Sequence, residues 1–479
     1  MNTEVNSAVN IPFMPKKKKG NLRRIANIIV QNKLLSAENE QLYRQNERLT
    51  HEIDKYKELI SRASSSTVPV KTQLERKSYQ IRYKTATVLY VNVMAAEHFL
   101  PQLDTKLVVD SLDELFINLQ QIAAKYTIKN IRTIGDALMY VGGIPNKNIT
   151  NPIEVLQAAV EMQYYFKVLQ QTKTIGKIWK LRIGIHTGTV LASASARKKQ
   201  KYEVKGETIN LATRILQFCE DGNILISATT YELVKDLFLC DYHSKMPVKY
   251  EGEIPLYMVK SIKPEFSLQG KGIIPNKRFS ICYGLIQFTN LQEIVLDKLE
   301  KHLPQNLYYH NVKHTMDVVT QVELIGLGEG VTDEDLLLLK TAALFHDTGH
   351  ALSYKDHEIM SCQTAREILP EYYYTTSQID TICELIMATK LPPKPRNKLE
   401  EIMCDADLDY LGRSDMVPVS NTLFLELKER SMIGTLTDWN RLQMRFISGH
   451  QYFTETARNL REVNKQAQIE RIKSLIVEE

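Results

Sequence analysis

The chain has 479 residues, of which 43% are hydrophobic and 24% are charged, so it is long enough for about three domains with ordinary cores. Its formal net charge of +5 is small for this length and gives no general case for nucleic-acid binding. Six cysteines without a C-x-x-C pair indicate neither a zinc ribbon nor a disulfide framework. No apolar run approaches the roughly 20 residues of a membrane span, and the N-terminus lacks the apolar core of a signal peptide, so we expect a soluble cytoplasmic protein.

The first 30 residues form a basic polar tail that contains four consecutive lysines, Lys16 to Lys19. A single run of this kind is typical of a solvated tail. Contact with an anionic membrane surface or with nucleic acid is the alternative interpretation.

A heptad repeat follows at 31–62. Its seam residues recur in steps of four and three: Leu35, Asn39, Leu42, Asn46, Leu49, Ile53, Tyr56 and Ile60. This spacing predicts a left-handed coiled coil, and buried asparagines at 39 and 46 would pair only in register, which favours a parallel homodimer. A single amphipathic helix lying on a neighbouring domain is the alternative. A serine-rich linker at 63–80 ends the repeat.

Strand-like and helical runs alternate between 81 and 262, which predicts an α/β domain. A linker at 263–285 contains prolines and glycines, and beyond it the pattern predicts an all-α domain at 286–479. Within this last domain, Thr332 and Asp335 precede an apolar run and predict the start of the helix that reaches His346.

Imidazole and carboxylate groups gather in four short strings of the C-terminal domain. The strings hold His310 with His314, His346 and Asp347 with His350, His357 with Glu358, and Asp405 with Asp407. Six of the eleven histidines fall between 302 and 357, which is more than a chance His–Asp dipeptide explains. Histidine and carboxylate ligands together suit Mn, Fe, Zn or Mg, so the strings predict a divalent metal site.

The order H…HD…D resembles the signature of HD-domain metal-dependent phosphohydrolases. The string from Tyr309 to His314 is also similar to the Y-H-N-x-x-H string of cyclic-nucleotide phosphodiesterases. The resemblance implies four metal ligands, which are His314, His346, Asp347 and Asp407. Asp405 is the alternative to Asp407, because both lie in the same short string.

The same resemblance implies that His310 donates a proton to the leaving oxygen. It implies that His350 and His357 bind a second metal or the phosphate. Further candidates for phosphate contacts are Thr389, Lys390 and Arg413, although ordinary surface roles explain them as well. His450 is expected to be a packed core histidine.

Three strings of the middle domain, at 131–137, 181–188 and 202–214, occur in an order that resembles class III adenylate/guanylate cyclase domains. The resemblance covers about 85–260 and implies a ferredoxin-like α/β fold that works as a dimer with sites at the interface. It implies that Asp136 binds Mg²⁺, that Asn210 and Arg214 stabilise the transition state, and that Arg132 and Glu203 select the base.

The middle domain departs from the cyclase pattern at the first metal aspartate, where this chain has Asn92. An amide contributes no charge toward Mg²⁺. The Gly-Phe-Thr expected to follow is replaced at 95–97, and a late lysine of the family aligns near Pro255. The domain is therefore interpreted as a degenerate cyclase that binds a nucleotide.

Together these observations predict an intracellular nucleotide-signalling protein, in which a metal-dependent HD phosphohydrolase is regulated by a cyclase-like domain. One alternative is a bifunctional protein that makes and degrades a cyclic nucleotide. The other is a signalling scaffold without activity. Asn92 opposes the first alternative, and the full set of histidines and aspartates opposes the second.

Overall fold

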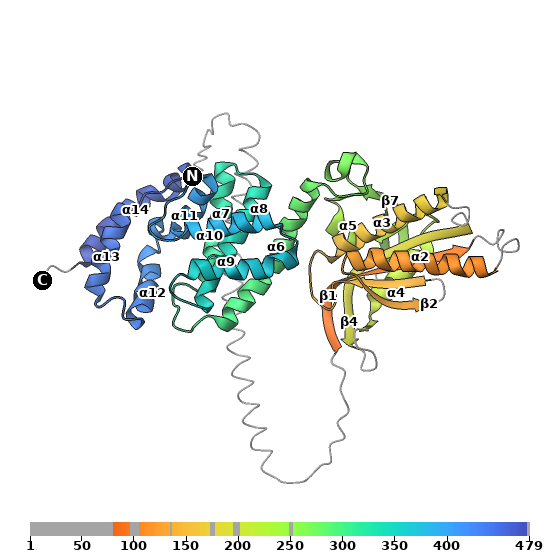
Figure 1. Ribbon diagram of the computed structural model, residues 1–479, viewed down its shortest axis with the longest axis horizontal. Helices are drawn as coiled ribbons and strands as arrows, with labels where there is room; N and C mark the ends of the chain where they lie inside the picture. The colour runs from red at the N-terminus through yellow and green to blue at the C-terminus, as the bar shows by residue number, and fades with distance from the viewer. Residues whose placement is uncertain are drawn as a thin grey trace, which may run out of the picture. The chain divides into compact units, whose positions relative to one another are not determined.

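The computed structural model describes residues 80–95, 105–134, 137–172, 178–194, 202–248 and 252–476. The predicted tail and coiled coil lie outside this part of the chain, as does nearly all of the 63–80 linker. The chain divides into two compact units between Leu291 and Gln292 (Figure 1).

The first unit is built on a mixed sheet, which confirms the predicted α/β class. The strands are β1 (Gln80–Ala95), β2 (Lys129–Ile134), β3 (Ala137–Gly142), β4 (Trp179–Ala194), β5 (Tyr202–Lys205), β6 (Ile224–Ser227), β7 (Phe238–Val248) and β8 (Gly252–Ile262). Their order is β2-β3-β1-β4-β6-β8-β7, with β5 paired to β4. Only the β4–β6 pair is parallel among these described strands.

Strand β1 is central because its run of β-branched and aromatic residues is buried on both faces. Leu89 and Val91 pack into a core shared with the helices α2 (Thr105–Lys125) and α3 (Asn151–Thr172). Tyr90 points the other way and packs with Ala212 of the helix α4 (Glu207–Phe218). Helix α5 (Ala228–Val234) follows β6. The strand that carries Asn92 is thereby held between two layers.

The second unit has helices and no strand among the described residues 292–476, which confirms the predicted all-α class. Its helices are the end of α6 (Lys277–His302), then α7 (Val312–Glu329), α8 (Asp333–Phe345), α9 (His357–Ile368), α10 (Thr376–Ala388), α11 (Lys398–Asp407), α12 (Met416–Glu429), α13 (Leu436–Gly449) and α14 (Glu455–Leu475). The side chain of Thr332 accepts the backbone N–H of Asp335 at 3.1 Å, so α8 begins where the sequence predicts.

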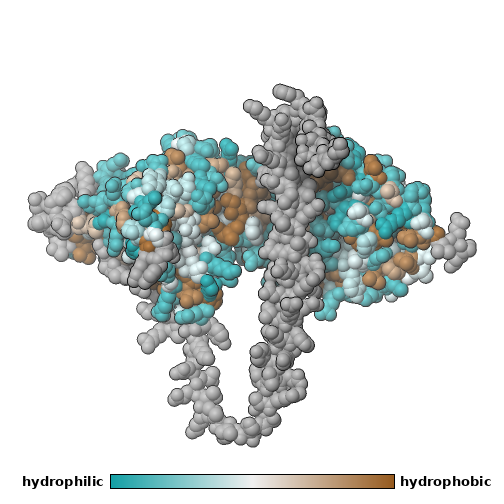
Figure 2. All heavy atoms as spheres, turned by 180° about the vertical axis from the view of Figure 1, so that it is seen from behind, coloured by the Kyte–Doolittle hydropathy of each residue, from teal (hydrophilic) through white to brown (hydrophobic). Residues whose placement is uncertain are grey.

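Helix α6 begins within the segment 263–285, where a linker is predicted, and it crosses the division between the two units. Near its start, the Tyr283 hydroxyl donates to Glu154 of α3 at 2.8 Å. The domain boundaries stay predictions. In Figure 2, hydrophobic side chains are interspersed with hydrophilic ones on the visible face of each unit. Among the described helices, none is long and apolar enough to cross a membrane.

Candidate metal centre and nucleotide site

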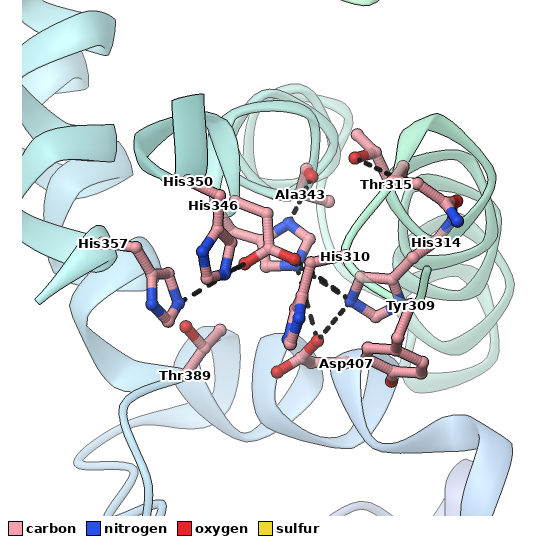
Figure 3. A network of polar contacts seen from close by, with 12 residues as sticks. Tyr309, His310, His314, Thr315, Ala343, His346, His350, His357, Thr389 and Asp407 are labelled. Carbon is pink, nitrogen blue, oxygen red and sulfur yellow. Dashed lines mark hydrogen bonds and ion pairs between the residues drawn. The ribbon is translucent and has the colours of Figure 1, made fainter. Parts of the chain in front are cut away.

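Local structure at three helix ends delivers the histidines and aspartates of the second unit to one place. Asn311 caps α7 by accepting the backbone N–H groups of Lys313 and His314, which sets His314 in the first helical turn. Helix α8 ends at Phe345 and its last five residues are buried, so His346 and Asp347 follow directly from a buried helical turn. Asp407 is the last residue of α11. The sequence positions are far apart, yet the side chains meet (Figure 3).

An inner group surrounds one oxygen of Asp347. Asp347 Oδ2 lies 3.2 Å from His346 Nε2 and 3.4 Å from His314 Nε2. Asp407 Oδ1 lies 3.2 Å from His314 Nε2 and 3.5 Å from His346 Nε2. The Nδ1 of His346 lies 2.8 Å from the carbonyl oxygen of Ala343, which assigns its proton to that nitrogen and turns the Nε2 lone pair toward the carboxylates.

A second group faces the other oxygen of the same carboxylate. Asp347 Oδ1 lies 3.5 Å from His357 Nε2 and 3.8 Å from His350 Nε2. The His350 and His357 rings stack with their centroids 3.9 Å apart. Neither ring nitrogen of His350 has a hydrogen-bond partner among the described residues, although the side chain is 1% exposed. Buried, unpartnered nitrogens beside a carboxylate are what a metal ion would satisfy.

Glycine at 349 lets this second group form. The short 3-10 turn Thr348–Ala351 carries His350, and α9 begins at His357. A Cβ built on Gly349 would lie 2.0 Å from the carbonyl oxygen of His357. The backbone of the turn therefore contacts α9 directly, which brings the two imidazoles together.

The inner group holds two buried carboxylates, Asp347 and Asp407, whose negative charge needs a nearby positive charge. Burial lowers the pKa of His346, but the carboxylates of Asp347 and Asp407 raise it more, so the net pKa lies well above the ordinary value. Burial raises the pKa of Asp347, while His346, His310 and His350 lower it to well below its usual range. Buried carboxylates thus hold positive charge on the imidazoles, and a divalent ion would supply that charge instead.

His310 is held by a carboxylate that the sequence did not indicate. Glu426 of α12 is fully buried, and its Oε1 lies 2.5 Å from His310 Nδ1. Its Oε2 accepts the backbone N–H groups of Tyr309 and His310 at 3.0 and 3.2 Å. Burial lowers the pKa of His310, but Glu426 and Asp347 raise it by more than burial lowers it. The net pKa of His310 is therefore above the ordinary value. The sequence analysis missed Glu426, because a single glutamate on an amphipathic helix carries no signal of its own.

The structure separates the two aspartates that the sequence left open. Asp405 is fully buried and accepts the backbone N–H groups of Phe453 and Thr454 at the start of α14, at 2.9 and 2.8 Å. Asp407, in contrast, faces His314 and His346. This geometry favours Asp407 as the ligand and gives Asp405 a role in holding α14.

The remaining candidates are three polar residues proposed to contact phosphate and one histidine expected to be packed in the core. Thr389 lies near His357 (Figure 3) and its hydroxyl donates to the Ile386 carbonyl at 2.8 Å. Lys390 pairs with Asp356 at 2.9 Å. Arg413 is bound by Asp415 at 2.6 Å and by Asp317 at 3.2 Å. The His450 ring is buried against Phe446 and Tyr452, as expected for a core histidine.

A cavity of about 530 Å³ opens beside the inner and second groups, which together are called the metal-ligand group below. Its apolar lining comes from several helices and includes Leu408, Leu411, Met416, Leu427, Trp439 and Phe446. At its polar end lie His310 and Asp347. Gln443 also lines it, and its side-chain Nε2 is buried without a hydrogen-bond partner among the described residues. The sequence analysis missed Gln443, because one glutamine on an amphipathic helix carries no signal of its own.

Three candidate residues of the first unit lie on described elements: Asn92, Asn210 and Arg214. Asn92 is half-buried on β1, where it pairs with Ala137 and Arg182. Asn210 is exposed on α4, and the Arg214 guanidinium donates to the Pro247 carbonyl. Among the described residues, no hydrogen bond or ion pair joins Asn210 or Arg214 to Asn92.

The other candidates of the first unit lie at strand ends. Glu203 is exposed on β5 and lies 3.0 Å from Lys205. Arg132 belongs to β2, but its side chain lies outside the described part, and Asp136 lies between β2 and β3, also outside it.

Comparison with known proteins assigns both units. The model of the adenylate and guanylate cyclase catalytic domain matches residues 78–261, and the HD domain model matches residues 311–409. The chain contains a nucleotide cyclase domain and an HD domain. Cyclase domains bind nucleotides and often form dimers, and HD domains bind divalent metals, so the pairing supports a role in nucleotide signalling.

Curated proteins that are similar to this chain include guanylate cyclases. A soluble guanylate cyclase of Caenorhabditis elegans is 26% identical over 255 residues, which are 51% of this chain and 35% of that protein. The human guanylate cyclase soluble subunit beta-2 is 26% identical over 240 residues, covering 50% of this chain and 39% of that protein. The chain thus spans well under half the length of these relatives.

Solved structures of cyclases are also similar to part of the chain. The adenylyl cyclase CyaB from P. aeruginosa is 26% identical and covers 38% of this chain and 96% of its own, with a TM-score of 0.35. The guanylate cyclase domain of RhGC from Catenaria anguillulae, solved in complex with GTP, is 26% identical and covers 38% of this chain and 100% of its own, with a TM-score of 0.34.

Proposed function

We propose that the HD domain is a metal-dependent phosphodiesterase acting on a cyclic nucleotide, regulated by a cyclase domain that binds a nucleotide and pairs with a second copy of the chain. The observation that carries this proposal is the carboxylate of Asp347, whose two oxygens face two separate sets of imidazoles. A carboxylate so placed suits two divalent ions, each from the set Mn, Fe, Zn or Mg.

The residues present divide the work of hydrolysis. His314, His346, Asp347 and Asp407 would hold one ion, and His350 and His357 would complete the place for another. When bound, a divalent ion would supply a water with a pKa of about 7 and would polarise the phosphoryl oxygen. Glu426 orients the His310 ring and keeps it protonated, so that His310 can give its proton to the departing alkoxide.

The cavity beside the centre supports a nucleotide as the substrate. Its volume of about 530 Å³ lies within the range of small-molecule sites. Apolar and aromatic walls would cover the faces of a planar base, while the buried amide of Gln443 would reach the base edge. The phosphate would then lie at the polar end, beside His310 and Asp347.

Hydrolysis of a panel of phosphodiesters by the full chain, loaded in turn with Mn²⁺, Zn²⁺ and Mg²⁺, tests the proposal. We expect one or more cyclic nucleotides to be hydrolysed. Gln443→Leu should raise KM for that nucleotide about tenfold, because one hydrogen bond in a buried site is lost. The same variant should hydrolyse bis(4-nitrophenyl) phosphate, which has no base, as the native chain does. If no phosphodiester is cleaved with any metal, the scaffold interpretation stands instead.

Weak or absent cyclase activity is expected, because Asn92 leaves Asp136 without a second carboxylate to hold Mg²⁺. Turnover of ATP, GTP, CTP and UTP should stay below about one per second, the lower end of ordinary enzyme rates. Asn92→Asp should raise turnover, and Arg214→Ala in that background should abolish it. Faster turnover by the native chain would favour the bifunctional alternative.

The cyclase domain should regulate the HD domain through the nucleotide that it binds. Regulation requires the nucleotide to favour one of two arrangements of the protein. Adding nucleoside triphosphate should therefore change the phosphodiesterase rate of the native chain. The change should be lost in Arg214→Ala and kept in Arg82→Ala, which removes an exposed arginine of the same domain. An equal response of all three proteins would leave dimerisation as the domain's role.

A further inference from the structure

Two cysteines of the HD domain face each other across neighbouring helices. The Cys362 thiol of α9 donates to the carbonyl oxygen of Cys383 at 3.5 Å, and the Cys383 thiol of α10 donates to the carbonyl oxygen of Cys362 at 3.8 Å. Each sulfur thus contacts the backbone of the other residue, which places the pair within the reach of a disulfide.

The surroundings hold this pair in place and favour a thiolate. Arg366 and Asp380 form an ion pair of 2.7 Å between the same two helices, one turn away from the sulfurs. The hydrogen bond from Cys362, together with the nearby Arg366, lowers the pKa of Cys383 to about 7. Thiolates are the reactive form of cysteine. Cys383 is only 6% exposed, so a small oxidant is needed to reach it.

The thiol pair is connected to the metal-ligand group through the neighbouring residue. The Ser361 hydroxyl donates to the carbonyl oxygen of His346 at 2.6 Å and accepts the backbone N–H of Gly349 at 2.8 Å. Helix α9 also begins with His357. A change in the position of α9 at Cys362 would therefore act on residues of both imidazole groups.

We propose that Cys362 and Cys383 form a reversible disulfide when the protein meets a small peroxide, and that this bond lowers the activity of the adjacent metal centre. One thiolate attacks the peroxide, whose O–O bond breaks, and becomes a sulfenic acid. The second thiol displaces the sulfenic oxygen as water, so two thiols and hydrogen peroxide give one disulfide and two waters. The sulfurs must come to about 2.05 Å, which draws α9 toward α10.

The experiment treats the full chain with hydrogen peroxide and maps its peptides without reduction. We expect a linked pair of peptides that contains Cys362 and Cys383 and has lost two hydrogens. The linked pair should be absent from Cys362→Ser and Cys383→Ser, and present in Cys240→Ser, which removes a cysteine of the cyclase domain. If both thiols stay reduced, or if each is oxidised without linking to the other, the proposed disulfide between Cys362 and Cys383 is wrong.

The effect of the disulfide on the metal centre rests on the proposed phosphodiesterase activity, so two readouts test this effect. Hydrolysis by the oxidised native chain should fall about fivefold and return with dithiothreitol, while Cys362→Ser should be unaffected by peroxide. Metal content per chain, measured after dialysis, should fall in parallel and needs no substrate. A complete disulfide with unchanged metal content and unchanged hydrolysis would overturn the effect on the centre. Metal loss without any measurable hydrolysis would count against the substrate and support the switch.

Discussion

Replacing both His346 and Asp347 by alanine is expected to remove bound metal from the HD domain and to reduce hydrolysis by at least about a thousandfold. These residues supply the Nε2 lone pair and the carboxylate that faces both imidazole groups. Activation of water by the ion is the largest single contribution asked of the site. Metal content by mass spectrometry and hydrolysis of bis(4-nitrophenyl) phosphate measure the two effects.

The control for this prediction keeps the size of the side chain. Asp347→Asn preserves the volume but removes the charge, so it should also lose metal while the circular dichroism of the chain is retained. His450→Phe replaces a buried histidine outside the group and should keep its metal. Full retention of metal by the double variant would contradict the assignment of the centre.

A loss of activity that depends on the leaving group is expected for His310→Asn. A sugar alkoxide is a strong base and needs a proton as it leaves, so hydrolysis of a cyclic nucleotide should fall by about a hundredfold to ten-thousandfold. Nitrophenolate leaves without a proton, so hydrolysis of bis(4-nitrophenyl) phosphate should change far less. Equal losses with both substrates would show that His310 binds metal instead.

The role of His310 as the proton donor can also be tested by the pH dependence of kcat in Glu426→Gln. Glu426 helps to raise the pKa of His310, and the acid acts only while it is protonated. Activity on the alkaline side therefore ends where His310 loses its proton. Removing the carboxylate lowers that pKa, so the alkaline limb of the kcat profile should move to lower pH. An unchanged limb would mean that another group sets it.

The sequence predicted the metal-ligand group because its members are chemically rare together. His346 and Asp347 are adjacent, and His310 and His314 lie four residues apart, so short strings already carried most of the pattern. The sequence could not find Glu426, because its contact with His310 joins residues 116 positions apart. Nor could it separate Asp405 from Asp407, because that choice depends on which face of α11's last turn meets α14.

In the cyclase domain, the sequence predicted the fold class but not the arrangement of the candidate site residues. Alternating strands and helices predicted its class, and the run from Ala86 to Val91 in β1 is buried on both faces, as in a sheet covered on both sides. The loss of charge at Asn92 was also visible from the sequence. What the residues could not give was how Asn92 lies relative to Asn210 and Arg214, because this follows from the three-dimensional packing of β1 against α4.

Position 349 constrains how this centre can change over evolutionary time. The carbonyl oxygen of His357 occupies the space that any side chain at 349 would need. Even a methyl group there would push α9 outward and part the stacked rings of His350 and His357. A lineage could therefore lose the second imidazole group through a single substitution that touches no ligand. Such a descendant would keep His314, His346, Asp347 and Asp407, and sequence motifs alone would not reveal the change.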